Sequence, residues 1–251
     1  MTSALVGQAV LLDSVKHRDR KLQPLADFSI TRGLHAVFLT ATEFVEAARE
    51  LPIIFIDNGE GRAAGKASFS PVALLGLQAG ENLQLEGTRW VGRYLPAFVR
   101  RFPFSTGAVA GGDAPGVFVH ENWPGFNTTE GEALFESDGT AAPALKRAIE
   151  FLERFDTEEQ RTRAFCARLA ELDVLKGMKA DATLPNGETL SIDGFLAVDE
   201  DKLRALPDAT VLELHRSGML VLLHAHLLSL GTMRHLINRK AALQAATPTS
   251  T

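Results

Sequence analysis

The residues best suited to metal chemistry lie near the start of the chain, where His17 and Asp19 form a His-x-Asp pair. This spacing opens the triad of two histidines and one carboxylate that holds iron in many oxygenases. The triad needs a distal histidine, for which His120 is available. The flanking sequence SVKHRDRKL is strongly charged and is typical of a surface segment. An iron-dependent oxygenase or another modifying enzyme is therefore the alternative function, and we expect no metal site.

Other catalytic patterns are weaker. The sequence has no G-x-S-x-G motif, and its glycine-rich stretch AVAGGDAPG lacks the Lys-Ser/Thr ending of a phosphate-binding loop. On a helix, His224 and His226 point about 200° apart, so their rings cannot share one metal ion. Cys166, the only cysteine, falls in a helical pattern as a small core residue. The sequence thus favours a non-catalytic protein over an enzyme, and it predicts no cofactor.

Arginine and aromatic residues gather in the stretch GENLQLEGTRWVGRYLPAFVRRFPF, residues 80–104. If residues 89–99 are helical, two rings share one face and several guanidinium groups share the next. Such a cluster suits recognition of an anionic group or a protein surface, although arginine stems can equally cover the edges of a packed aromatic core. The predicted binding residues, for a protein, a peptide or a small anionic ligand, are Trp90, Arg93, Tyr94, Arg100 and Arg101.

The predicted secondary structure changes along the chain, from strands in the first part to helices in the second. Short apolar runs predict strands at residues 35–40 and 51–57, with a helix between them. Residues 71–77 and 82–87 are predicted to form the next strand pair, separated by the turn-like QAGE.

Helical periodicity dominates after Gly139. Apolar residues repeat along one helical face in 140–155 and again in 156–172. Thr157 and Gln160 have the spacing of a capping box, which marks helix starts. We therefore predict two antiparallel helices joined by a short turn.

A hairpin and further helices close the chain. Asn186-Gly187 predicts a tight turn between two strands, because both residues tolerate positive φ. Short helices are predicted on either side of Pro207, and a leucine-rich helix over residues 219–236 follows them. That last helix offers a surface for self-association, so an oligomeric scaffold is the second alternative function. Residues 240–251 are predicted to be a frayed tail.

These patterns together predict an α+β fold, with a mostly antiparallel sheet from the N-terminal half packed against helices from the C-terminal half. A single domain over residues 1–251 is expected, with its change of texture near residue 139. The composition, 45% hydrophobic and 23% charged, is that of an ordinary globular protein. A net charge of −5 argues against nucleic acid as a partner.

Targeting signals are weak. The N-terminus MTSALVGQAVLLDSV has no positive residue before its apolar run, which a signal peptide would have. The longest apolar run, MLVLLHAHLLSL, is interrupted by two histidines and is too short to span a bilayer. We expect a cytoplasmic protein without a transmembrane segment.

Several phrases resemble the SapC family of bacterial proteins, over about Val10 to Asn238. They include AARELPIIFI, PVALLGLQAGENLQLEGTRWVGRYLPAFVRRFPF and GFLAVDEDKLRALPDATVLELHRSGMLVLLHAHLLSL. The resemblance implies a soluble accessory protein, linked by the family name to S-layer protein secretion. It also implies a locus shared with TonB-dependent receptors, flavin-dependent halogenases and cupin-like oxygenases. It brings no catalytic residue to any position of this chain.

Overall fold

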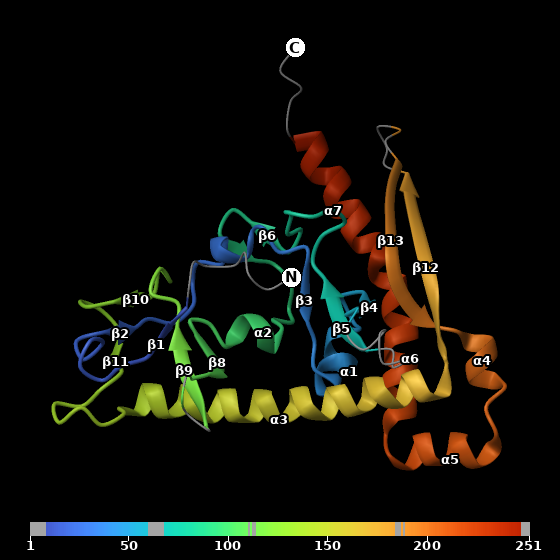
Figure 1. Cartoon of the computed structure of the whole chain (residues 1–251). Helices are drawn as coiled ribbons and strands as arrows, with labels where there is room; N and C mark the ends of the chain where they lie inside the picture. The colour runs from blue at the N-terminus through green and yellow to red at the C-terminus, as the bar shows by residue number, and fades with distance from the viewer. Residues whose placement is uncertain are drawn as a thin grey trace. The chain divides into compact units, whose positions relative to one another are not determined.

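The protein has an α+β fold with several antiparallel sheets, and its longer helices lie mainly in the C-terminal half (Figure 1). The structure is a computed structural model that describes residues 9–59, 68–109, 111, 114–183, 187 and 189–246. The predicted fold class is therefore confirmed. The chain divides into two compact units, each built from separate stretches of sequence. Unit 1 comprises Met1–Gly33, Leu85–Val91 and Ala97–Thr157, and unit 2 comprises Leu34–Gln84, Gly92–Pro96 and Glu158–Thr251. The single-domain expectation stays a prediction.

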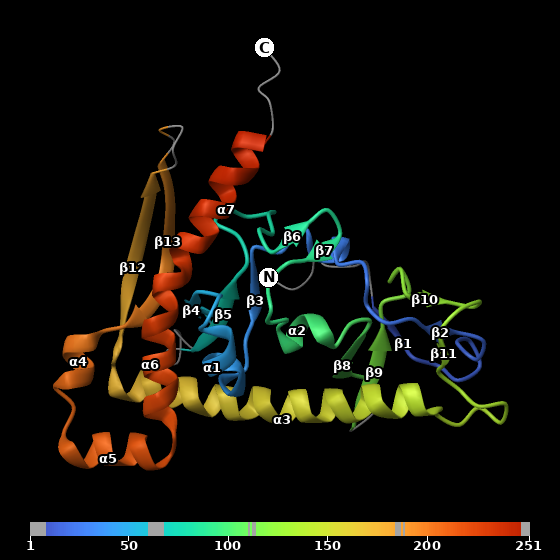
Figure 2. The ribbon, with the colours of Figure 1, turned by 180° about the vertical axis from the view of Figure 1, so that it is seen from behind.

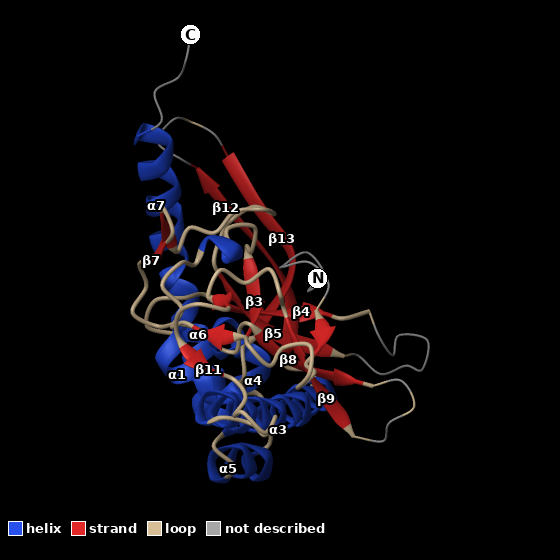
Figure 3. Cartoon of the chain, turned by 90° about the vertical axis from the view of Figure 1, so that its left-hand side faces the viewer, coloured by secondary structure: helices blue, strands red, loops and turns tan. Residues whose placement is uncertain are grey.

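Unit 1 is built on short strands (Figure 3). One sheet has the order β1-β9-β8, a second has the order β10-β2-β11, and β6 pairs with β7. Its helices are the single turns η1 (Ser29–Thr31) and α2 (Ala97–Arg100), and the first part of α3. Its strands are β1 (Val10–Leu11), β2 (Lys21–Leu22), β6 (Leu85–Glu86), β7 (Arg89–Trp90), β8 (Phe104–Ala108), β9 (Pro115–Val119), β10 (Phe126–Asn127) and β11 (Glu132–Ala133).

Unit 2 contains a five-stranded antiparallel sheet in the order β12-β13-β4-β5-β3. The late hairpin completes the sheet, because β13 pairs with β4 at Leu196 and Phe55. The apolar run of β4 is fully buried from Ile53 to Phe55, as expected for a strand covered on both faces. The strands are β3 (Ala36–Phe38), β4 (Ile53–Asp57), β5 (Phe69–Leu74), β12 (Leu175–Thr183) and β13 (Thr189–Val198).

Helices of unit 2 pack around this sheet. Figures 1 and 2 show α6 and α7 running on from one another beside β13. Leu236 of α7 is fully buried in a cluster with Ile54, Val72 and Phe195 of the sheet. The helical elements are η2 (Ala41–Glu43), α1 (Phe44–Ala47), α4 (Glu200–Arg204), α5 (Asp208–Arg216), α6 (Met219–Ser229), η4 (Leu230–Thr232) and α7 (Met233–Ala246).

The last helices form one apolar stretch. Met219–Ala245, 27 residues that contain an 18-residue window with a mean hydropathy of 1.3, is long and apolar enough to cross a membrane by length and composition alone. Core helices of soluble proteins meet the same criterion. The expected absence of a transmembrane segment therefore stays a prediction.

The two antiparallel helices predicted for residues 140–172 are a single helix, α3 (Pro143–Leu172). At the expected break, the Thr157 hydroxyl donates a hydrogen bond of 2.8 Å to the carbonyl oxygen of Glu153. A threonine inside a helix often bonds back in this way and needs no cap. Glycine and proline are absent from residues 144–172, so nothing in the sequence forces an end. The capping-box prediction was wrong.

Three smaller predictions need comment. Residues 71–77 and 82–87 share one backbone hydrogen bond, from Leu83 to Leu75 at 2.7 Å, but they form no strand pair: β5 lies between β3 and β4, and β6 pairs with β7. The hairpin of β12 and β13 is confirmed, although Asn186 of its predicted turn lies outside the described residues. The predicted frayed tail is helical as far as Ala246, and residues 247–251 lie outside the described part.

A candidate anion-binding pocket

The arginine- and aromatic-rich stretch is not one helix. Only α2, Ala97–Arg100, is helical, and Trp90 belongs to β7. Pro96 stands directly before α2, which fits because proline is tolerated at a helix start and not in its interior. The shared helical face expected for the rings therefore does not exist. Of the predicted binding residues, unit 1 contains Trp90, Arg100 and Arg101, and unit 2 contains Arg93 and Tyr94.

In unit 2, two glutamates hold the segment around Tyr94. The Glu50 carboxylate accepts hydrogen bonds of 2.8 Å from the backbone N–H groups of Arg93 and Tyr94. The Tyr94 hydroxyl donates a 2.6 Å hydrogen bond to the buried carboxylate of Glu43. Glu43 also accepts from the backbone N–H and the hydroxyl of Thr40, at 2.9 and 2.8 Å. Tyr94 thus serves the fold, while the Arg93 side chain is exposed.

In unit 1, Trp90 is a packed residue. It is only 9% exposed, and its ring lies 6.0 Å from that of Phe28. Its neighbour Arg89 is exposed and forms an ion pair of 2.6 Å with Glu86. In this part of the stretch the aromatic ring is packed in the protein, which was one of the two interpretations that the sequence allowed.

Arg100 and Arg101 line a pocket of about 230 Å³ in unit 1. Helix α3 supplies one wall, since residues spaced by three and four positions face the same side. Segment 100–104, β2 and β11 supply the others. The lining residues are Leu22, Gln23, Pro24, Arg100, Arg101, Phe102, Phe104, Glu132, Ala144, Arg147, Ala148 and Phe151, which we call the arginine pocket.

The charges of the arginine pocket are unequal. Three of its lining residues are arginines, and Glu132 is the one carboxylate among them. Glu132 is paired with Arg147 at 2.5 Å. The Arg100 guanidinium lies 5.4 Å from the ring centroid of Phe151, and among the described residues it forms no ion pair. The net positive charge favours an anion.

Aromatic rings hold Arg101 in place. Its guanidinium lies 4.3 Å from the ring centroid of Phe98 and 5.1 Å from that of Phe155, which suits cation–π attraction. Phe102 stacks on the buried ring of Trp123 at 5.9 Å. Residues 98–102 are thus fixed by packing. A fixed cation loses less freedom when it binds a ligand than a mobile one does.

Sequence reasoning missed Arg147. It stands in the helical pattern ALKRAIEFL, where an arginine is normally a solvated surface residue. Its position four residues before Phe151 places both on one side of α3. The spacing of Arg147 and Phe151 could be recognised in the sequence. The sequence gives no indication, however, that segment 100–104 lies against this side of α3.

The structure gives the iron alternative no support. His17 is fully buried and both ring nitrogens have partners: Nδ1 lies 2.9 Å from the Asp13 amide nitrogen, and Nε2 lies 3.1 Å from a carboxylate oxygen of Glu121. A hydrogen bond from Lys16, and to a smaller extent one from His17, lowers the pKa of Glu121 below its usual value. Asp19 is exposed. Within the described ranges, no three His, Cys, Asp or Glu side chains are grouped to hold a metal ion.

His226 is a core histidine. Its Nδ1 donates to the carbonyl oxygen of Ile53 at 2.8 Å, and its Nε2 accepts from the Val198 amide at 3.1 Å. Burial lowers its pKa to about 4, so it is neutral at pH 7. Burial likewise raises the pKa of the Cys166 thiol to about 12, which makes it a poor nucleophile.

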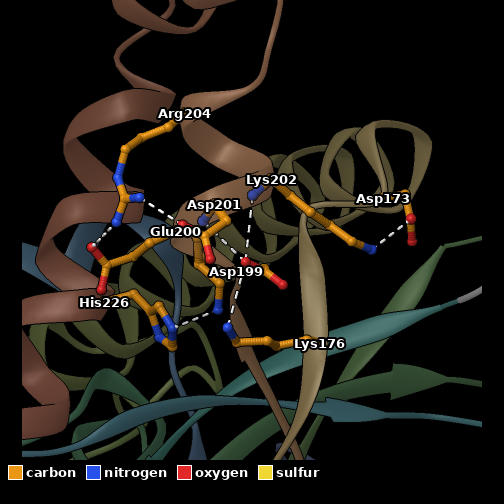
Figure 4. Close-up of polar contacts among 9 residues, drawn as sticks. Asp173, Lys176, Asp199, Glu200, Asp201, Lys202, Arg204 and His226 are labelled. Atoms are coloured by element: carbon orange, nitrogen blue, oxygen red, sulfur yellow. Dashed lines mark hydrogen bonds and ion pairs between the residues drawn. The ribbon is translucent and has the colours of Figure 1, made fainter.

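The charged cluster beside His226 is a helix cap. Figure 4 shows Asp199 at the start of α4, accepting from the backbone N–H groups of Asp201 and Lys202. Asp199 also pairs with Lys176 at 3.4 Å, and Lys202 pairs with Asp173 at 2.7 Å. Each of these side chains is thus engaged in the cap or in an ion pair within the protein.

The fold and the pocket define an α+β protein with an arginine-lined cavity. A family model described as SapC matches residues 12–236, and the chain belongs to the SapC family. The resemblance seen in the sequence is therefore confirmed. Searches of curated proteins and of solved structures found no match.

Proposed function

We propose that this SapC-family chain is a non-catalytic binding protein that takes a small anionic ligand in the arginine pocket. The observation that carries the proposal is the gathering of Arg100, Arg101 and Arg147 around one cavity with a single carboxylate. An accessory role in secretion, or in a locus of TonB-dependent uptake and modification, is the context that family membership supports. A cytoplasmic location is part of the same proposal.

The apolar lining favours one kind of anion. Phe102, Phe104 and Phe151 contribute ring surface, and further apolar side chains surround them. A carboxylate matches the planar fork of arginine, and an apolar body attached to it would displace water from the rings. We therefore expect an aromatic carboxylate to bind more tightly than acetate or inorganic phosphate.

Isothermal titration calorimetry with benzoate, acetate and phosphate tests the proposal. Arg100→Ala should weaken benzoate binding about tenfold, because a charge-assisted hydrogen bond is lost. Arg89→Ala is the matched control: it removes an exposed arginine of the same unit that does not line the pocket. Equal affinity in the two variants, or no binding of any of the three anions by the unmodified protein, would overturn the proposal.

Arg93→Ala belongs in the same series. The sequence predicts that Arg93, Arg100 and Arg101 meet an anionic group together, and this stays a prediction. A loss of affinity in Arg93→Ala comparable to that of Arg100→Ala supports it. An affinity equal to that of Arg89→Ala confines the site to the arginine pocket.

A further inference from the structure

Large apolar side chains lie in solvent on one side of α6. Leu228 is 76% exposed and Val221 is 55% exposed. With His224 they fall within about 60° of the helix circumference, since each residue turns about 100°. Val45 of α1, 45% exposed, lies beside them. We call Val45, Val221, His224 and Leu228 the α6 patch.

The α6 patch borders a groove of about 510 Å³ between α1 and α6 of unit 2. Figures 1 and 2 both show these two helices side by side. The other lining residues are Ala48, Arg49 and Ala225, so the surface is mostly apolar with one cation. A contiguous exposed apolar surface of this kind usually marks a site of contact with another protein or with a membrane.

The composition of the helix also indicates that something covers it. A helix that is apolar around its whole circumference is normally buried in a core or in lipid. Only 33% of the apolar window within Met219–Ala245 is buried inside the protein. The uncovered part includes the α6 patch.

The charge distribution identifies the covering partner as anionic. After Glu213 the sequence contains four arginines or lysines and no aspartate or glutamate, which leaves a net −9 for residues 1–213. Glu46 is paired with Arg49, which lines the groove, and Glu213 of α5 is paired with Arg168. α6 itself carries no lysine or arginine, but the exposed Arg216 precedes it and the exposed Arg234 follows it. These cations at the two ends of α6 would attract an anionic surface and would repel the same face of a second copy.

We propose that the α6 patch docks on an anionic phospholipid surface. Leu228 and Val221 enter the boundary between headgroups and acyl chains, and the exposed Arg216 and Arg234 at the two ends of α6 supply the electrostatic attraction. The helix lies on the membrane and does not cross it. Its second half is fixed to unit 2, because Lys240 pairs with Glu81 and Arg239 donates to the carbonyl oxygen of Leu83.

Vesicle co-sedimentation tests this proposal. The full chain should bind vesicles that mix phosphatidylglycerol with phosphatidylcholine, should bind phosphatidylcholine alone weakly, and should lose binding as salt is raised. Leu228→Glu should reduce the bound fraction about tenfold, because it places a negative charge at the apolar contact. Val15→Glu is the matched control, since Val15 is 78% exposed and belongs to unit 1.

The outcomes separate the rival occupants. Failure of the unmodified protein to bind mixed vesicles, or equal binding by Leu228→Glu and Val15→Glu, overturns the proposal. So does a dimer in light scattering that Leu228→Glu dissociates, which would assign the α6 patch to self-association. The arginine pocket lies in the other unit, so anion titrations fail or succeed independently of these results.

Discussion

Polar side chains are used differently in the two units. In unit 2, Glu43, Glu50 and His226 each bond to backbone groups or to a tyrosine, and so hold the chain in place. In unit 1, the Arg100 guanidinium faces a pocket and rests on a ring. Clustering of arginine and aromatic residues therefore does not mark a binding site by itself. A polar group of such a cluster is available to a ligand only where the fold does not already supply it with a partner.

The largest effect is expected from removing an internal partner in unit 2. Glu43→Ala leaves the Thr40 amide and the Tyr94 hydroxyl without their acceptor inside the protein. Buried donors left in this way cost about 1–3 kcal/mol each relative to the native pairing. We expect the free energy of unfolding, measured in urea, to fall by about 3 kcal/mol.

Tyr94→Phe isolates one part of this loss, because it removes only the hydrogen bond from the Tyr94 hydroxyl to Glu43 and keeps the ring. Its cost should be about 1 kcal/mol. If Glu43→Ala unfolds at the same urea concentration as the unmodified protein, the carboxylate does not stabilise unit 2 and the comparison fails.

The second prediction concerns pH and His226. Its pKa of about 4 in the folded protein lies below the value of 6.5 expected in the unfolded chain, so unfolding is accompanied by proton uptake between these values. The stability it contributes is present above pH 6.5 and is lost as the pH falls toward 4. The expected slope approaches about 1 kcal/mol per pH unit. Urea unfolding at pH values of about 7, 6 and 5, which cover most of this interval, measures the slope.

His226→Gln is the control for this slope. The variant lacks the titrating ring, while all other ionisable groups remain and contribute equally. An identical pH dependence in the two proteins would show that His226 keeps the same pKa on unfolding.

The smallest effect is expected in unit 1. Glu132→Gln removes the carboxylate that pairs with Arg147 and increases the positive charge of the arginine pocket. Exposed ion pairs contribute about 0–1 kcal/mol, so stability should hardly change. Benzoate affinity should rise about threefold, as measured by calorimetry. A lower affinity would mean that Glu132 helps to bind the ligand or to orient Arg147 for it.

Local patterns predicted much of the fold. The apolar run of β4, the strands of the late hairpin and the helices after Pro207 are each encoded by neighbouring residues. The break predicted near Thr157 was wrong because a threonine that caps a helix and one inside a helix have the same local sequence. The good helix formers Glu158, Glu159 and Gln160 follow directly, and no glycine or proline interrupts the pattern.

The site was less predictable than the fold. Arg100 and Arg101 were found from composition, but the acceptor of the Tyr94 hydroxyl is a glutamate 51 positions away in the sequence. Arg147 comes from a helix that looks solvated in sequence. Side-chain partners brought together by distant segments leave no periodic signal. Only the folded protein therefore separates the part of the stretch that is packed from the part that lines the pocket.

The strand order of the unit 2 sheet has a consequence for synthesis. β4 pairs on one side with β5, which follows it closely, and on the other with β13, which the ribosome makes more than a hundred residues later. At about 5–20 residues per second, that edge of β4 stays unpaired for roughly 7–30 s on the nascent chain. During this interval the backbone N–H and C=O groups of that edge lack their strand partner, and the apolar segment Ile53–Phe55 is a target for chaperones. A chain released before Thr189 would carry it into the cell uncovered.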